Sequence, residues 1–245
     1  MIELLQDPAV WASFLTLAIL EIVLGVDNVI FISIATAKLP EEQRPRARFL
    51  GLALALIMRV ALLFSIAWIV GLSDPIATIL GWEVSWRDLI LIAGGLFLLY
   101  KASTEIFDEV EGGIHTAEER VVEAVFARVI VQIVLLDLVF SFDSVLTAVG
   151  IAEHIEVMVA AVVVAIVVMM VAATPIAEFV EKHPSTKMLA LAFLVMVGMT
   201  LVAEGFHVHV EKGFVYAAMA FSLSVEALNL WRQKRRQRLA AEAAE

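Results

Sequence analysis

Seven long apolar segments run along the chain, and short polar stretches separate them. Each segment approaches the length of about 20 residues that a helix needs to cross a bilayer. The stretches between them carry Pro or Gly where helices are expected to break, for example at Pro40, Pro75 and Gly213. The pattern predicts seven transmembrane helices, at 10–37, 49–72, 88–106, 125–150, 155–180, 188–204 and 213–231.

The composition agrees with this pattern. Of 245 residues, 62% are hydrophobic and 18% are charged, and the mean hydropathy is +0.94. A soluble domain has about a quarter of its residues charged, so we expect an all-α polytopic membrane protein and no soluble enzyme fold. The absence of Cys excludes disulfides and thiolate metal sites. The net charge of −10 argues against nucleic acid as a partner, because binding phosphate needs a basic surface.

The basic residues predict the orientation in the bilayer. Of the 17 Lys and Arg residues, all but Arg59, Arg87 and Lys212 fall in the loops after the first, third and fifth segments or in the C-terminal tail. Basic residues collect on the cytoplasmic side of a membrane. We therefore expect a multi-pass membrane protein with the N-terminus outside and the C-terminus in the cytoplasm.

Two decapeptides in the first and fourth segments match in residue type at every position. They are residues 21–30 (EIVLGVDNVI) and 137–146 (DLVFSFDSVL), with a constant offset of 116 residues. Three spans separate them, so the two copies enter the membrane from opposite sides, as in many secondary transporters. A similarity between the segments that begin at Gly95 and Gly198 is too short to add weight.

The repeat predicts the organisation of the chain. A single transmembrane domain at 1–231 would contain an inverted 3+3 repeat and one extra helix, followed by a cytoplasmic basic tail. The first repeat is expected at 10–106, the second at 125–204, the extra helix at 213–231 and the tail at 232–245.

Four acids lie inside the repeated segments: Glu21, Asp27, Asp137 and Asp143. A charged residue near a helix centre costs about 2.5–3.5 kcal/mol even on lenient insertion scales, so such residues usually have a function. In the inverted arrangement, two carboxylate layers are expected on either side of the midplane, one with Glu21 beside Asp143 and one with Asp27 beside Asp137. Six residues turn a helix by about 240°. Asp27 and Asp143 therefore face other helices than Glu21 and Asp137 do, or the backbone is unwound near Gly25 and Ser141.

The charges suggest a cation. Arg59 is the deep basic residue and is expected to act as a fixed counter-ion, which leaves three negative charges if all four acids are ionised. A divalent cation and at least one bound proton would balance them. Oxygen ligands suit hard ions such as manganese, magnesium or calcium. The predicted metal ligands are the acids and their polar neighbours: Glu21, Asp27, Asn28, Asp137, Asp143 and Ser144.

The two acidic motifs, the loop that begins at Ala37 and the segment 182–190 resemble the TerC family of bacterial membrane proteins, in particular its short-chain branch. The resemblance covers nearly the whole chain. It implies a seven-helix fold related to the LysE transporter superfamily, a location in the bacterial inner membrane, metal-ion export with manganese as the best-supported ion, and an association with tellurite resistance. The family's metal-binding acids match the four acids above. No prosthetic group is expected, only a transported ion.

Other interpretations stay open at this stage. The four acids could be structural, and the protein could be a membrane scaffold or insertion factor without transport. An intramembrane aspartyl enzyme is disfavoured because Gly25-Val26-Asp27 lacks the second Gly of the GxGD pattern, so we do not expect an enzyme. Lys101 and Glu105 are expected to form an exposed pair, and Met169 to face lipid. The sequence leaves the oligomeric state, including a homo-oligomer, and the transport direction open.

Overall fold

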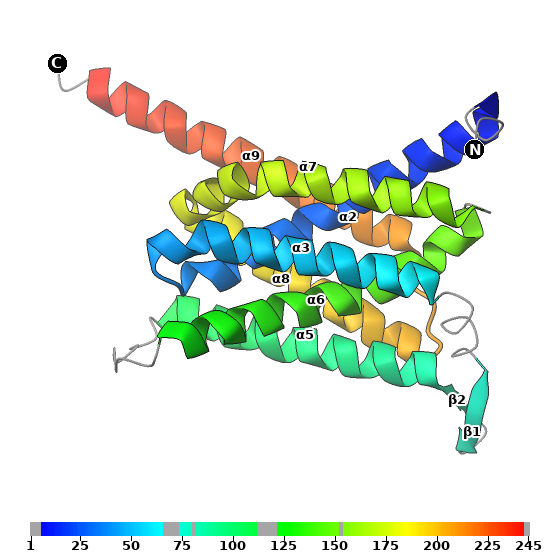
Figure 1. Cartoon of the computed structure of the whole chain (residues 1–245). Helices are drawn as coiled ribbons and strands as arrows, with labels where there is room; N and C mark the ends of the chain where they lie inside the picture. Colours follow the sequence, from blue (N-terminus) through cyan, green and yellow to red (C-terminus); the bar gives the residue numbers. More distant parts are fainter. Residues whose placement is uncertain (1–5, 66–73, 80–81, 112–121, 152–153, 243–245) are drawn as a thin grey trace.

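The computed structural model describes residues 6–65, 74–79, 82–111, 122–151 and 154–242 (Figure 1). Within these ranges, seven helices are long and apolar enough to cross a membrane, which confirms the predicted fold class. A single 3-10 turn and a two-stranded sheet complete the described elements. The helices are α2 (Pro8–Ala37), α3 (Arg44–Phe64), α5 (Trp86–Glu111), α6 (Val122–Ile151), α7 (Ile155–Lys182), α8 (Pro184–Gly205) and α9 (Lys212–Glu242), and the 3-10 turn is η1 (Glu41–Gln43).

The helices begin at residues that favour a helix N-terminus. Asp7 accepts a hydrogen bond from the backbone nitrogen of Ala9 at 2.8 Å and caps α2. Proline lies in the first turn of α2, α3 and α8. Backbone N–H groups in a first turn have no partner within the helix, so proline, which lacks this group, costs no hydrogen bond there. Most ends lie within a few residues of the prediction, but α9 continues as a helix through the basic segment to Glu242. The predicted second span extends into residues 66–73, which lie outside the described part.

A small hairpin, which the hydropathy pattern did not predict, precedes α5. Strands β1 (Pro75–Ile79) and β2 (Trp82–Ser85) pair antiparallel, with an irregularity between Pro75 and Ala77. Ser85 then begins α5 in a reciprocal cap: its backbone nitrogen donates to Asp88 Oδ2 at 2.8 Å, and the backbone nitrogen of Asp88 donates to Ser85 Oγ at 3.2 Å. Such short strands carry too few alternating positions to stand out beside long apolar helices.

Small residues set the closest helix contacts. α5 packs along α8, where Gly95 and Gly198 meet: a Cβ on Gly95 would lie 2.6 Å from the carbonyl oxygen of Gly198. α2 packs along α7, where Gly25 lies against Met169. The prediction that Met169 faces lipid is therefore wrong, since its side chain is 3% exposed. The sequence could not show that α7 offers its methionine to the glycine of α2.

Several helix contacts, though not α2–α3 or α7–α8, are related as an inverted repeat would relate them. If α2, α3 and α5 exchange with α6, α7 and α8, the pair α2–α7 becomes α6–α3, and both pairs are present. The contacts α2–α6, α3–α7 and α5–α8 map onto themselves. Gly95 and Gly198, which the weak sequence similarity aligned, meet within the last of these pairs. The contacts support the repeat, which itself stays a prediction.

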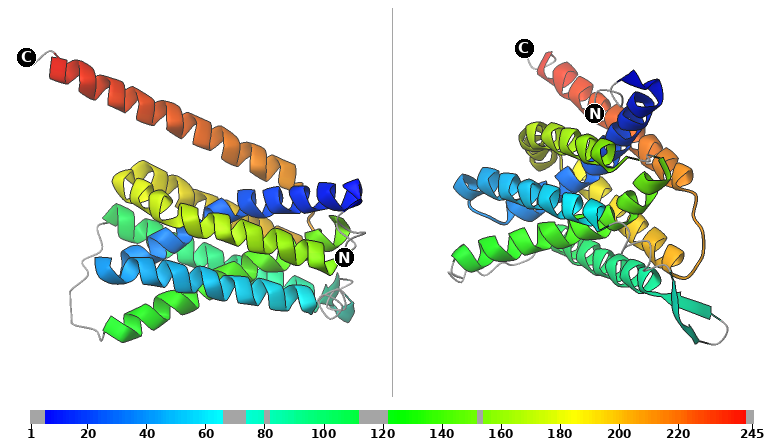
Figure 2. Two further views of the ribbon diagram at one scale, coloured as in Figure 1. Left: turned by 45° about the horizontal axis from the view of Figure 1, so that its top comes forward. Right: turned by 45° about the vertical axis from the view of Figure 1, so that its right-hand side comes forward.

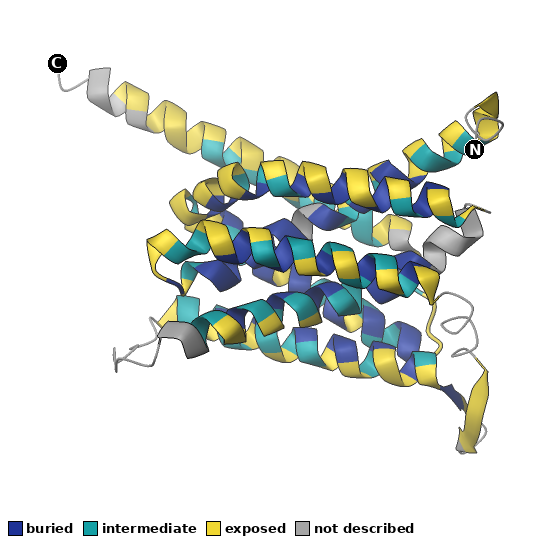
Figure 3. Ribbon diagram, viewed as in Figure 1, coloured by how far each residue is buried: buried dark blue, intermediate teal, exposed yellow. Residues whose placement is uncertain are grey.

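Many exposed positions lie on the helices of the bundle (Figure 3), and large apolar residues occupy many of them. Ile57 on α3, Tyr100 on α5 and Val171 on α7 are each at least 64% exposed. In water such a surface would favour aggregation, whereas in a bilayer these side chains contact lipid. The exposed faces and the long apolar helices together indicate a protein embedded in a membrane.

Helix α9 stands apart from the other six. Figure 2 shows it running obliquely along one side of the bundle, and none of its membrane-length window is buried. Its packing contacts are mainly with α8. Ser185 Oγ, in the first turn of α8, donates to Glu226 Oε1 of α9 at 2.5 Å. This arrangement agrees with the prediction that the last helix is an addition to two three-helix units.

We call the end of the bundle where α2 and α9 begin the outer end, because the basic residues predict that it faces outward. Single cysteines at Glu42 and His154 test this orientation without interference, since the chain contains no Cys. We expect an impermeant thiol reagent to label the cysteine at His154, between α6 and α7, in intact cells. The cysteine at Glu42, between α2 and α3, should react only after lysis. The reverse labelling pattern would contradict the orientation.

Candidate functional site

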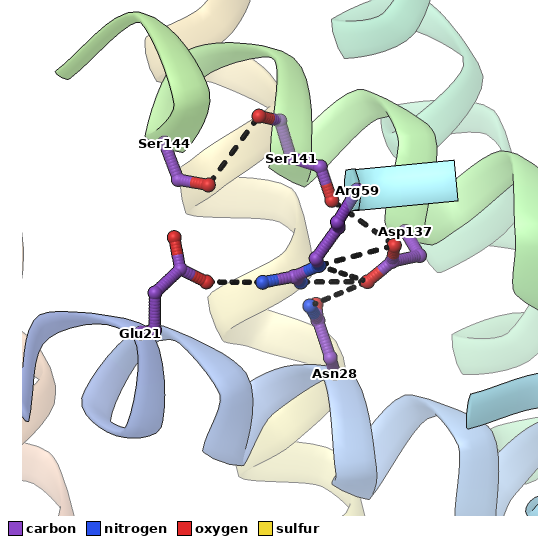
Figure 4. Close-up of polar contacts among 6 residues, drawn as sticks. All are labelled: Glu21, Asn28, Arg59, Asp137, Ser141 and Ser144. Atoms are coloured by element: carbon purple, nitrogen blue, oxygen red, sulfur yellow. Dashed lines mark hydrogen bonds and ion pairs between the residues drawn. The ribbon is translucent and has the colours of Figure 1, made fainter. Parts of the chain in front are cut away.

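Arg59 joins two acids from the repeated segments at the centre of the bundle (Figure 4). Its Nη1 donates to Glu21 of α2, and its Nη2 donates to Asp137 Oδ1 of α6 at 2.6 Å. Its Nε lies 3.2 Å from both carboxylate oxygens of Asp137. The three side chains are no more than 7% exposed. A planar guanidinium can bridge two carboxylates in this way, so Arg59 ties α2, α3 and α6 together.

The helix periodicity places these residues on inward faces. On α3, Leu52, Ala55, Arg59 and Leu63 are buried at intervals of three or four residues, which is one helical stripe. Glu21 and Asp137 both lie near the middle of their 30-residue helices. One guanidinium therefore reaches both acids. Arg59 thus connects the two carboxylates that the sequence assigned to separate layers.

Three polar side chains lie beside these charged groups. Asn28 lies two helical turns after Glu21 on α2, and Ser141 and Ser144 lie one and two turns after Asp137 on α6. Asn28 Nδ2 donates to Asp137 Oδ1 at 3.3 Å, and Ser141 Oγ donates to Asp137 Oδ2 at 3.0 Å. Ser144 Oγ donates to the backbone oxygen of Ser141 at 3.3 Å. Asp137 therefore accepts hydrogen bonds from α2, α3 and its own helix. Ser141 was not among the predicted ligands. We call the six residues together the Arg59 cluster: Glu21, Asn28, Arg59, Asp137, Ser141 and Ser144.

The other two predicted acids, Asp27 and Asp143, have side chains outside the described part. Their backbones are helical, and α2 and α6 continue unbroken past Gly25 and Ser141. The alternative in which the backbone is unwound there is therefore wrong. Among the side chains that are described, no three of His, Asp or Glu are grouped so as to hold a metal ion. The complete ligand set stays a prediction, because half of its acids lie outside that part.

A cavity of about 90 Å³ opens beside the cluster. It is large enough for several water molecules. The polar residues that line it come from five helices, and they are Asn28, Arg59, Ser144, Thr200, Glu204 and Tyr216. The remaining wall is apolar and includes Val197, Leu201 and Met219. The cavity connects the Arg59 cluster with the last turns of α8 and the first turns of α9.

Glu204 is a buried acid that the sequence reasoning missed. It lies in the last turn of α8 and is 8% exposed. The hydropathy pattern marked it as the end of the sixth span, where an acid normally faces water. One sequence signal could have identified it: Glu204 lies one helical turn after the polar residue Thr200, on the helix that corresponds to α5 in the predicted repeat.

A second polar cluster closes the inner ends of α2 and α5. Lys38 Nζ lies 2.6 Å from Glu105 Oε1, and Lys101 Nζ lies 2.9 Å from the same oxygen. The predicted pair of Lys101 with Glu105 is therefore present, but Glu105 is 6% exposed, so the prediction that this pair is exposed is wrong. Lys38, which the sequence did not associate with this pair, reaches Glu105 from the loop after α2. Lys187 on α8 pairs with Glu109 on α5 at the same end.

Comparisons with known proteins match the whole transmembrane region. A profile of the "Integral membrane protein TerC family" matches residues 6–239. The UPF0053 inner membrane protein YgdQ of Escherichia coli (strain K12) is 55% identical over 231 residues, which cover 94% of this chain and 97% of that protein. A UPF0053 protein of Haemophilus influenzae is 51% identical over 230 residues, with the same coverage.

A longer relative shows the same similarity over part of its length. The UPF0053 inner membrane protein YoaE of Escherichia coli (strain K12) is 51% identical over 227 residues, which cover 93% of this chain and 44% of that protein. No solved structure matches this chain.

Proposed function

The chain belongs to the TerC family of integral membrane proteins, and we propose on this basis that it is a secondary transporter that exports a hard divalent cation, with manganese as the substrate. The proposed binding site comprises the acids and polar neighbours of the two repeated segments. The observation that carries the proposal is the buried Arg59 cluster, which lies near the middle of α2 and α6 beside a cavity lined in part by polar side chains.

The charge balance supports a cation. Glu21, Asp137 and Arg59 together carry one net negative charge when all are ionised. Asp27 and Asp143 follow six residues after the two paired acids on the same helices and add two more. A surplus of three negative charges within membrane-spanning helices is strongly unfavourable unless protons or a cation offset it. A divalent ion supplies two charges, and one proton supplies the third.

The ligand types support a hard ion. The donors of the site are carboxylate, amide and hydroxyl oxygens, which magnesium, calcium and manganese prefer over soft metals. The choice of manganese rests on the family resemblance. The exporting direction and an exchange with protons are parts of the same proposal.

The helix arrangement supports transport. The two copies of the acidic motif lie on α2 and α6, which contact each other at the centre of the bundle. Inverted repeats allow the two halves of a transporter to rock about a central site. A scaffold or insertion factor would need none of the central acids, and the variants described below separate these two functions.

The test is metal flux in proteoliposomes that contain the purified chain. We expect uptake of manganese and little or no uptake of zinc or copper. Metal displaces protons from the acids, so manganese affinity should rise with pH. A pH gradient across the vesicle membrane should then drive manganese uphill.

Empty liposomes, and vesicles in which a protonophore collapses the gradient, serve as controls. The absence of flux for every divalent ion would contradict the transporter proposal. An affinity that stays the same from mildly acidic to mildly alkaline pH would contradict proton exchange alone.

A further inference from the structure

The hydrogen bonds to Asp137 occupy the acceptor positions of its carboxylate (Figure 4). Its Oδ1 accepts from Arg59 Nη2 at 2.6 Å and from Asn28 Nδ2 at 3.3 Å. Its Oδ2 accepts from Ser141 Oγ at 3.0 Å, and Arg59 Nε lies 3.2 Å from both oxygens. A carboxylate has about four lone-pair positions, and these donor groups address all of them. A cation could therefore coordinate Asp137 only by displacing a donor.

The donor that a cation displaces most readily is the guanidinium of Arg59. A divalent ion bound to Asp137 would lie beside this guanidinium, and like charges that close repel each other strongly. The side chains of Arg59 and Asp137 are no more than 7% exposed, so solvent ions screen the repulsion little. Asn28 and Ser141 are uncharged, and a cation repels them far less. Arg59 and a cation thus exclude each other at Asp137.

Arg59 has a second partner and free space beside it. Its Nη1 donates to Glu21 of α2, on the other side of the guanidinium from Asp137 (Figure 4). Arg59 also lines the cavity of about 90 Å³, which has room for several water molecules and hence for a displaced guanidinium. Rotations about the bonds of the arginine side chain can therefore release Asp137 while the contact with Glu21 is kept.

We propose that Arg59 is a displaceable counter-ion, which competes with the divalent cation for Asp137 and thereby lowers the affinity of the site. This inference rests on the proposed transport function and concerns the regulation of the same site. The guanidinium holds Asp137 in the steps of the transport cycle without metal, and the cation takes its place on binding. The return of the guanidinium then favours release of the cation. A tethered positive charge of this kind compensates the buried carboxylate when no metal is bound.

Two variants of Arg59 separate displacement from the effect of a fixed nearby charge. Arg59→Lys keeps the charge, but an ammonium group cannot hold Asp137 through two parallel hydrogen bonds as a guanidinium does. Such a competitor is easier to displace, so we expect the Kd of manganese to fall by about tenfold. A counter-ion that stays in place predicts a wild-type Kd, because the charge near the cation is the same. Arg59→Met removes the charge and should lower the Kd further, by about a hundredfold from the wild-type value.

The measurement is titration calorimetry with manganese on the purified full chain in lipid nanodiscs. It is made at mildly alkaline pH, where protons compete least with the metal. Arg46→Met, at an exposed arginine of the same helix, is the matched control and should keep the wild-type Kd. Melting temperatures give a second reading. At equal manganese concentration, the stabilisation by metal should be larger in both Arg59 variants than in the wild type, because it grows as the Kd falls.

Arg59→Lys decides the question even where Arg59→Met does not fold, because it retains the positive charge between the two acids. A Kd at or above the wild-type value in Arg59→Lys would overturn the displacement, whatever the value in Arg59→Met, and would leave the proposed function intact. A wild-type protein that binds no manganese would instead contradict the proposed function.

Discussion

Replacing Arg59 by methionine is expected to lower the free energy of unfolding by about 3–5 kcal/mol, the range observed when one partner of a buried ion pair is removed. Methionine fills similar space without charge, so the loss reflects the carboxylates of Glu21 and Asp137, which remain buried without their common donor. Arg59→Lys should recover only part of the loss, because an ammonium group cannot bridge two carboxylates as a guanidinium does. Thermal unfolding of the purified protein in detergent measures the effect.

Two further variants show whether the loss comes from unpaired charge. Arg46→Met removes an exposed arginine from the same helix and should leave the melting temperature near that of the wild type. The triple variant Glu21→Gln/Arg59→Met/Asp137→Asn removes all three charges and should regain most of the stability. If Arg59→Met melted at the wild-type temperature, the cluster would not hold the three helices together.

The helices and the two acidic motifs could be predicted because their signals lie within single segments. A run of apolar residues long enough to cross a bilayer leaves few alternatives to a helix, since every backbone polar group must be satisfied within the segment. The decapeptides at 21–30 and 137–146 likewise match without any knowledge of packing. The basic loops add an orientation, because they report the side of the membrane and not a contact.

Contacts between helices were harder to predict from the sequence. Lipid and a neighbouring helix are equally apolar, so hydropathy does not distinguish the side of α7 that faces lipid from the side that receives Gly25. The same ambiguity concealed Met169 in the core. Glu105 seemed exposed because its neighbour in sequence, Lys101, offered a pair, whereas its burial depends on Lys38 from another helix end.

The candidate site likewise contains residues that the sequence could identify and residues that only the packing of the helices reveals. The charge of Arg59 suggested a counter-ion, and the structure adds its two partners, Glu21 and Asp137. Glu204 could not be selected from sequence because an acid at the end of a span usually faces water. Its position becomes significant only once α9 and α2 enclose the same cavity. A residue of this kind is recognised by what surrounds it and not by its own motif.

Asp27→Asn and Asp143→Asn are each expected to reduce manganese flux by at least about a hundredfold while leaving folded protein in the membrane. Both variants keep the size of the side chain and remove a charge that is expensive to bury, so a purely structural acid should tolerate the change or gain stability. A metal ligand should not, because an amide supplies an oxygen without the negative charge that a divalent ion requires. The measurement is flux in proteoliposomes with equal amounts of each protein.

The comparison with Glu178→Gln makes the result specific. Glu178 is an exposed acid of α7, and its neutral variant should transport manganese at the wild-type rate. Size-exclusion profiles and melting temperatures confirm that all variants are folded, so a loss of flux then reports binding or translocation. Glu21→Gln separates the two kinds of acid further, because it leaves Arg59 with Asp137 alone and should reduce stability as well as flux. Wild-type flux in both Asp27→Asn and Asp143→Asn would remove the acids from the transport site and favour a scaffold, which needs no central charge.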